Sequence, residues 1–214
     1  MGDKAKMKTV LTVLVVLAIV VLGGIGFMYS GAYDVSASKP DKGLIRWALV
    51  TTQRHSVHRG VAALQGKVRV PDLEDPKRLQ IGLAHYHEMC TTCHGAPGVN
   101  ISEIGQGLNP DPPELSDVGR DAPEETFWVV KNGIKMTGMP SFGVTHTDDE
   151  IWDIVAFVRK MGKLTPQQYQ AMVHQAGLGA PGQEKEGHEQ GEGQSARPPQ
   201  PEQHPLAPGA PPSH

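Results

Sequence analysis

The pentapeptide Cys90-Thr91-Thr92-Cys93-His94 constrains this chain more than any other feature. Its two cysteines are the only ones among 214 residues, so neither a disulfide framework nor a four-thiolate zinc site can hold the fold. On a helical turn, two cysteines three positions apart face the same side, and each can form a thioether to one vinyl group of a porphyrin. The histidine that follows is then held beneath the iron as an axial ligand. The motif therefore predicts one covalently attached haem of the c type.

Two other interpretations of a CxxC pair fit this chain less well. A thioredoxin-like redox pair is expected next to a βαβ unit, whereas the sequence before Cys90 has the pattern of a helix. A zinc clip made of both cysteines and two histidines is the other alternative. The thioredoxin-like interpretation also gives no role to the loop-rich sequence that follows the motif.

The second axial ligand has to come from elsewhere, and a methionine-containing segment downstream supplies candidates. Residues 135–143 contain two methionines, Met136 and Met139, among Gly and Pro. A thioether opposite histidine raises the haem potential and fills the sixth position. Core packing is the usual role of a single methionine, but this loop favours ligation by Met139. Met136 and His146 remain as alternatives.

The N-terminal 35 residues predict a membrane anchor. Three lysines precede an uncharged run at residues 9–33. Roughly 20 apolar residues suffice to cross a hydrocarbon core of about 30 Å, and the lysines mark the cytoplasmic end. A cleaved signal peptide, with a site near residues 35–37, is the alternative, although its apolar region would span only about 7–15 residues. Under both interpretations the rest of the chain is exported. With the anchor retained, we expect a single-pass protein of the inner membrane with its haem domain in the periplasm.

Beyond the anchor we expect three regions: a connector at residues 36–71, a compact domain at residues 72–176 and an unfolded tail at residues 177–214. The tail consists mostly of Gly, Pro, Gln, Glu and His, which bury too little apolar surface to fold. Within the connector, residues 44–64 mix apolar and basic side chains. They predict either a helix on the membrane surface or a helix that packs on the domain or on a partner subunit.

The domain itself predicts an all-α fold. Asp75 followed by Pro marks the start of a helix over residues 76–90. A second helix is expected over residues 123–132, and a third from residue 147 to 162 with apolar positions at helical spacing. The Gly- and Pro-rich residues 95–122 read as loops.

This pattern resembles that of class I cytochromes c over residues 79–163. In that family a glycine and an aromatic residue stand eight and four positions before the first haem cysteine, and here Gly82 and Tyr86 occupy those positions. The last helix of the family is similar to residues 153–158. The resemblance implies that Gly82 lets the first and last helices cross closely, with Tyr86 and Phe157 packed beside the crossing.

The resemblance also implies roles for residues of the haem site. The family has a methionine ligand in a Gly-Met-Pro loop, which Met139 matches. It also has a proline whose carbonyl accepts the Nδ1–H of the ligand histidine, here His94. Pro113 is the best match to this proline, and Pro110 and Pro112 remain as alternatives. Such an acceptor fixes the histidine tautomer.

Together these features predict an electron carrier rather than an enzyme. A His/Met-ligated iron has no open position for a substrate, so it would cycle between two oxidation states in a respiratory-type chain. Expected partners are the membrane and redox proteins, such as a quinol-oxidising complex, a terminal oxidase or a dehydrogenase. The net charge of −3 argues against nucleic-acid binding. The alternatives are a haem-bearing, electron-accepting subunit of an exported dehydrogenase or oxidase, and a haem sensor or peroxidase with a vacant sixth position.

Overall fold

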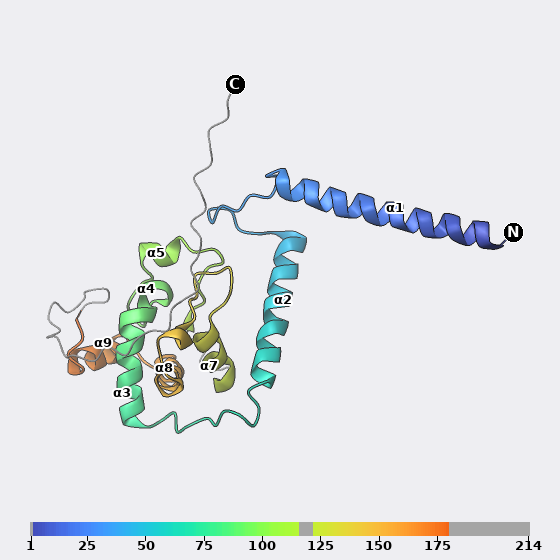
Figure 1. Cartoon of the computed structure of the whole chain (residues 1–214). Helices are drawn as coiled ribbons and strands as arrows, with labels where there is room; N and C mark the ends of the chain where they lie inside the picture. The colour runs from blue at the N-terminus through green and yellow to red at the C-terminus, as the bar shows by residue number, and fades with distance from the viewer. Residues whose placement is uncertain (1, 116–121, 180–214) are drawn as a thin grey trace, which may run out of the picture. The chain divides into compact units, whose positions relative to one another are not determined.

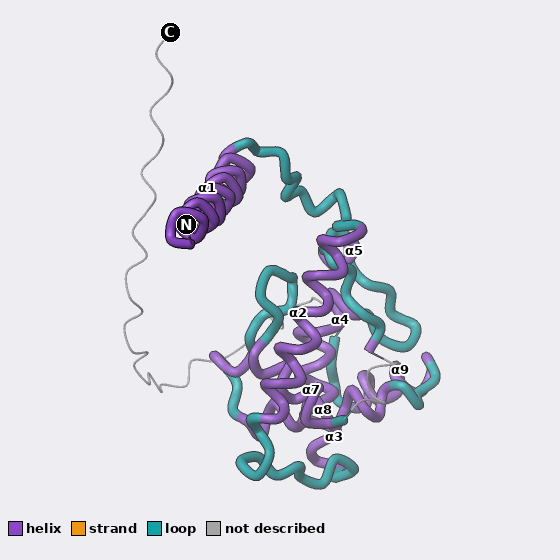
Figure 2. Tube along the Cα trace, turned by 90° about the vertical axis from the view of Figure 1, so that its right-hand side faces the viewer, coloured by secondary structure: helices purple, strands orange, loops and turns teal. Residues whose placement is uncertain are grey.

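The computed structural model describes residues 2–115 and 122–179, and these form helices joined by loops, with no strand in the described ranges (Figure 2). The predicted all-α fold is confirmed. The α-helices are α1 (Gly2–Tyr29), α2 (Gly43–Ala62), α3 (Pro76–His85), α4 (Thr91–His94), α5 (Glu103–Gln106), α7 (Pro123–Asn132), α8 (Asp148–Met161) and α9 (Pro166–Gln175). The described residues also contain two short turns: a π-helical turn, η1 (Tyr86–Cys90), and a 3-10 turn, η2 (Phe142–Val144).

The close crossing of α3 and α8 is the centre of the domain. A Cβ added to Gly82 would lie 1.9 Å from the carbonyl oxygen of Asp153 and 3.0 Å from the Cβ of Phe157. Beside the crossing, the rings of Tyr86 and Phe157 lie 5.4 Å apart and are tilted by 50°. The crossing that the family resemblance implied is therefore confirmed, and it depends on a residue without a side chain at position 82.

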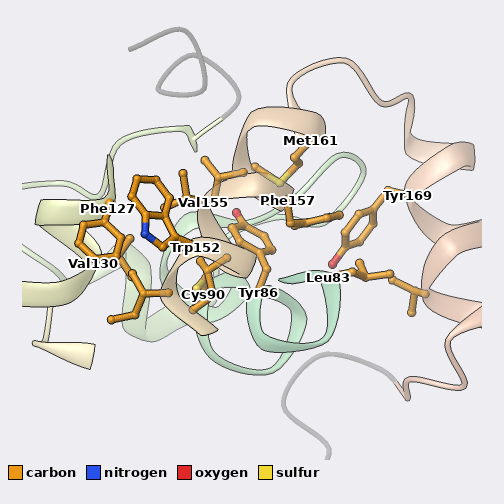
Figure 3. Packing of buried hydrophobic residues seen from close by; sticks show 14 residues of the cluster. Leu83, Tyr86, Cys90, Phe127, Val130, Trp152, Val155, Phe157, Met161 and Tyr169 are labelled. Atoms are coloured by element: carbon orange, nitrogen blue, oxygen red, sulfur yellow. The ribbon is translucent and has the colours of Figure 1, made fainter. Parts of the chain in front are cut away.

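The aromatic side chains of the core form two groups (Figure 3). Phe157 lies between Tyr86 and Tyr169, with ring centroids 5.4 and 6.4 Å away. Phe127 stacks on Trp152 at 4.3 Å, with the ring planes 16° apart. All five side chains are buried. Because they come from α3–η1, α7, α8 and α9, they join the helices of the domain into one core.

Two of the predicted helices begin and end where local sequence signals place them. α7 starts at Pro123, as expected for a proline in the first helical turn. α8 starts with a capping box: the Thr147 hydroxyl accepts from the Glu150 N–H, and the Glu150 carboxylate accepts from the Thr147 N–H at 2.7 Å. The helix then ends before Gly162.

Other parts of the domain differ from the sequence-based expectation. α9 was not predicted, yet it brings Tyr169 and Val173 into the core. The stretch expected to be loops, residues 95–122, contains the short helix α5. Residues 116–121 and all but the first three residues of the predicted tail lie outside the described ranges.

The connector helix α2 packs on the domain through its C-terminal half (Figure 1). Val57 is buried there, and a Cβ added to Gly60 would lie 2.3 Å from the indole of Trp128 on α7. The N-terminal half differs, because Leu44 and Trp47 are exposed. The connector thus includes both a domain contact and an uncovered surface.

α1 is the one helix in the described residues that is long and apolar enough to cross a membrane. Its span, Lys6–Tyr29, has 24 residues and a mean hydropathy of 2.9. None of its most apolar stretch is buried against the rest of the protein. In length and composition, this helix is therefore consistent with the predicted single N-terminal membrane span.

Candidate haem site

The helix that leads into the CxxCH motif contains one wider turn. The N–H of Thr91 donates to the carbonyl of Tyr86, five residues back, which defines the π-helical turn η1. The Thr91 hydroxyl donates to the carbonyl of His87 at 2.7 Å, so this buried side chain is satisfied. The predicted helix over residues 76–90 is thus regular only to His85. Turns of this kind occur frequently at functional sites.

Cys90 ends this turn and Cys93 lies in α4, and their thiols are unpaired because no disulfide joins them. Cys90 is 8% exposed, whereas Cys93 is only half-buried. Burial, with a smaller contribution from Cys93, raises the pKa of the Cys90 thiol to about 12. A redox-active CxxC pair needs a lowered thiol pKa instead. The arrangement therefore does not suit thioredoxin-like chemistry.

A hydrogen bond to the backbone decides the tautomer of His94. Its Nδ1 lies 2.9 Å from the carbonyl oxygen of Pro113. A carbonyl can only accept, so Nδ1 carries the proton and Nε2 keeps a free lone pair. Burial lowers the pKa of His94, while the bond to Pro113 opposes this shift. The neutral ring that results can ligate a metal ion through Nε2.

The backbone just after His94 is fixed by three short contacts. Gly95, with φ of 63°, ends α4 in a conformation that favours glycine. The buried hydroxyl of Tyr86 donates to the Gly95 carbonyl at 2.7 Å. Ala96 and Val99 exchange two backbone hydrogen bonds of 2.9 and 2.8 Å. The sequence pointed to Tyr86 for its packing, but the role of its hydroxyl depends on the folded loop and was missed.

The segment around α5 packs directly on the motif. Both the N–H and the hydroxyl of Ser102 donate to the Thr92 carbonyl, at 3.0 and 2.8 Å. A Cβ on Gly105 would lie 3.0 Å from the Cα of Cys93. The sequence analysis missed this contact. Ser102 is nevertheless a recognisable helix cap, because its hydroxyl accepts from the N–H of Gly105 three residues later.

Met139 lies in a loop that is tied down on both sides. Its N–H donates to the Thr137 hydroxyl at 3.1 Å, and its carbonyl accepts from Ile134 N–H at 3.1 Å. The side chain is half-buried and packs against the buried core. Next to it, a Cβ on Gly138 would meet the side chain of Leu108 at 2.6 Å. The loop thus contacts the segment that also covers Cys93.

The other two candidates for the sixth ligand lie in different surroundings. Met136 is 89% exposed, with a positive φ of 62°. The ring of His146 packs edge-on against His85 at 5.2 Å and Phe142 at 5.7 Å. Met136 therefore lies in solvent, whereas Met139 and His146 are both half-buried.

These groups fit a covalent haem by the chemistry of their donors. Two unpaired thiols stand on one turn, a neutral imidazole keeps Nε2 available, and a thioether lies in a loop that contacts the same segment. Among the described residues, no group of three or more His, Cys, Asp or Glu side chains is arranged to hold a metal ion by itself.

The helical fold and this set of thiol, imidazole and thioether groups define a c-type cytochrome domain. Residues 77–158 match the family described as "Cytochrome C oxidase, cbb3-type, subunit III". The chain is also 30% identical, over 92 residues, to the quinohemoprotein alcohol dehydrogenase ADH IIB of Pseudomonas putida. That match covers 43% of this chain and only 12% of the dehydrogenase. No solved structure matches the chain.

Residues 77–158 are therefore a c-type cytochrome domain of the kind that class I cytochromes c represent, and the domain carries covalently bound haem c. Such a domain implies electron transfer through its haem. The predicted family, fold and cofactor are confirmed.

Proposed function

We propose that this chain is a membrane-anchored periplasmic electron carrier of a respiratory-type chain, with His94 and Met139 as the axial ligands of one haem. The observation that carries the proposal is the loop over residues 134–140, which holds Met139 half-buried and leaves Met136 in solvent. A protein side chain at each axial position leaves no site for a substrate. The chain is then an electron carrier and not an enzyme by itself.

Each residue of the site has a separate task in this proposal. Cys90 and Cys93 hold the cofactor through thioethers, so it is not lost outside the cell. The Pro113 carbonyl orients the His94 ring and keeps its proton on Nδ1. Haem c supplies a one-electron Fe(III)/Fe(II) couple, whose potential a Met ligand raises.

The proposed membrane anchor is α1. Its side chains form an apolar surface without protein cover, which water would disfavour and a bilayer would accept. The lysines at its start favour the cytoplasmic side, so the domain would face the periplasm.

Optical spectra of the oxidised holoprotein test the ligand assignment. A Met–Fe(III) bond gives a weak absorption band at the red end of the visible spectrum. We expect this band in the native protein and in Met136→Ala, and its loss in Met139→Ala. A native protein that lacks the band and binds carbon monoxide readily when reduced would refute the assignment, and a sensor or peroxidase would become the better interpretation.

A second candidate function is a haem subunit of an exported dehydrogenase or oxidase. The matched family and the matched relative both carry names of such enzymes, and the exposed first half of α2 would offer a docking surface. Purification from native membranes in mild detergent separates the two functions. Stoichiometric co-purification with a larger redox enzyme would favour the subunit, whereas isolation of the chain alone would favour the independent carrier.

A further inference from the structure

The first two turns of α2 carry an apolar patch that nothing in the described residues covers. The patch consists of Leu44, Ile45, Trp47 and Leu49, which are 75, 44, 64 and 49% exposed. Beyond residue 36, the described chain exposes only three other large hydrophobic side chains. Four exposed apolar side chains within six residues are therefore a local feature of this helix and not a general property of the surface.

The contact between α2 and the domain does not use this patch. Val57 is the one buried side chain of the helix, and Gly60 lies against Trp128. Both residues belong to the C-terminal half. The helix is thus fixed on the domain at one end while its other end presents apolar side chains to the surroundings.

The charges of α2 indicate what kind of surface the patch would meet. Every charged side chain in the helix is an arginine, namely Arg46, Arg54 and Arg59, and no acidic residue is present. Arg46 lies within the patch itself. Basic residues beside Trp and aliphatic side chains suit the headgroup region of an anionic bilayer. A purely apolar protein interface would not need this uniform positive charge.

The connection to α1 keeps the patch near the end of the proposed membrane span. α1 ends at Tyr29, and α2 begins at Gly43. Between them the chain closes on itself, because the Tyr33 hydroxyl donates to the Asp41 carboxylate at 2.7 Å. A chain folded back in this way does not reach as far from the membrane as an extended one.

We propose that the apolar patch of α2 inserts into the headgroup interface of the bilayer that α1 crosses, with phosphatidylglycerol-type anionic lipids as its contacts. The proposal rests on the proposed anchoring by α1. Because the other end of α2 is packed on α7, insertion would hold the haem domain at a fixed position against the membrane surface. Electron transfer would then favour partners whose redox centres lie close to that surface.

Site-specific fluorescence in the full-length holoprotein tests this contact. The chain is reconstituted into vesicles of phosphatidylethanolamine and phosphatidylglycerol, and flotation first shows whether it is anchored. An environment-sensitive fluorophore is then attached in Leu44→Cys, and in Ser56→Cys as a matched control at an exposed position in the second half of the helix. Labelling is specific, because the two native cysteines are consumed by the haem thioethers. An unchanged haem spectrum shows that both variants fold.

We expect the label at position 44 to be quenched several-fold more by lipids carrying a nitroxide high on the acyl chain than the label at position 56. We also expect it to be several-fold less accessible to aqueous iodide. A floating chain with equal iodide access at both positions would overturn this inference alone. Protection from iodide without lipid quenching would also overturn it, because a protein would then cover the patch. A chain that does not float would overturn both this inference and the anchoring proposal.

Discussion

Replacing Gly82 by Ala tests the close crossing of α3 and α8 directly. The added Cβ would lie 1.9 Å from the Asp153 carbonyl oxygen, whereas ordinary van der Waals contact begins at 3.4 Å. The two helices would therefore have to separate by about 1.5 Å (3.4 − 1.9) along this contact. The clash involves backbone atoms, so no change of side-chain rotamer can relieve it.

The expected cost follows from two opposing contributions. Overpacking a core costs about 1–3 kcal/mol, and a backbone clash at the centre of the domain belongs at the upper end of that range. Alanine in a helix recovers about 1 kcal/mol relative to glycine. The net loss is then about 2 kcal/mol, which lowers the melting temperature of a domain of this size by roughly 8–16 °C. The separation would also loosen the contact between Tyr86 and Phe157.

Thermal unfolding of the detergent-solubilised holoprotein, followed by circular dichroism in the haem band, measures this loss. Gly107→Ala is the matched control, because its added Cβ would meet nothing closer than 3.5 Å. We expect the control to unfold within a few degrees of the native protein. If Gly82→Ala melts at the native temperature or above it, the close crossing is not required and the reasoning fails.

Three further substitutions probe contacts outside the haem site. Arg78→Leu leaves the buried carboxylate of Asp153 without its partner and should cost about 3 kcal/mol near neutral pH, the low end for a buried pair. Burial raises the pKa of Asp153, and Arg78 opposes this shift, so the stability lost in the variant should become smaller as acid protonates Asp153. Urea titrations that show the same loss of unfolding free energy at every pH would contradict this. Tyr169→Phe removes the hydroxyl that lies 2.8 Å from Nδ1 of buried His87 and should cost about 1–3 kcal/mol. Burial raises the pKa of Tyr169 from 10.0 to about 12, so the native protein should lose stability between these pH values more steeply than the variant. Parallel pH profiles of the two melting temperatures would argue against this role of the hydroxyl. Trp128→Ala removes the indole on which α2 packs, so trypsin should cleave α2 several-fold faster while the haem spectrum stays unchanged; equal cleavage rates would show that the contact does not hold the helix.

The parts of the fold that the sequence predicts correctly depend on signals that act over a few residues. Thr147 and Glu150 form a capping box three positions apart, and their spacing alone places the start of α8. Pro123 marks the start of α7 in the same way. The start of α9 was equally visible, since Thr165 and Gln168 form a second capping box, but this helix was not predicted.

Contacts between distant parts of the chain could not be derived in this way. His87 and Tyr169 are 82 positions apart, and nothing near either residue indicates that they form a hydrogen bond. The π-helical turn is another example, because one wider turn leaves the apolar spacing of the helix almost unchanged. Likewise, the sequence offers three prolines near position 113, and only the path of the folded loop brings one carbonyl to His94.

The two sides of the haem site are connected through one short segment, residues 105–108. At its start, Gly105 lies against the backbone of Cys93, and at its end, the side chain of Leu108 covers Gly138 beside Met139. A side chain at Gly105 would meet backbone atoms of Thr92 and Cys93 and would displace this segment from the motif, whereas at Gly138 it would meet only the flexible end of Leu108. The position of the loop that carries Met139 relative to the CxxCH motif therefore depends partly on the packing of a segment that supplies no ligand. This explains why the spacing of the motif and the methionine along the sequence could identify candidates for the ligands but could not fix how they face each other.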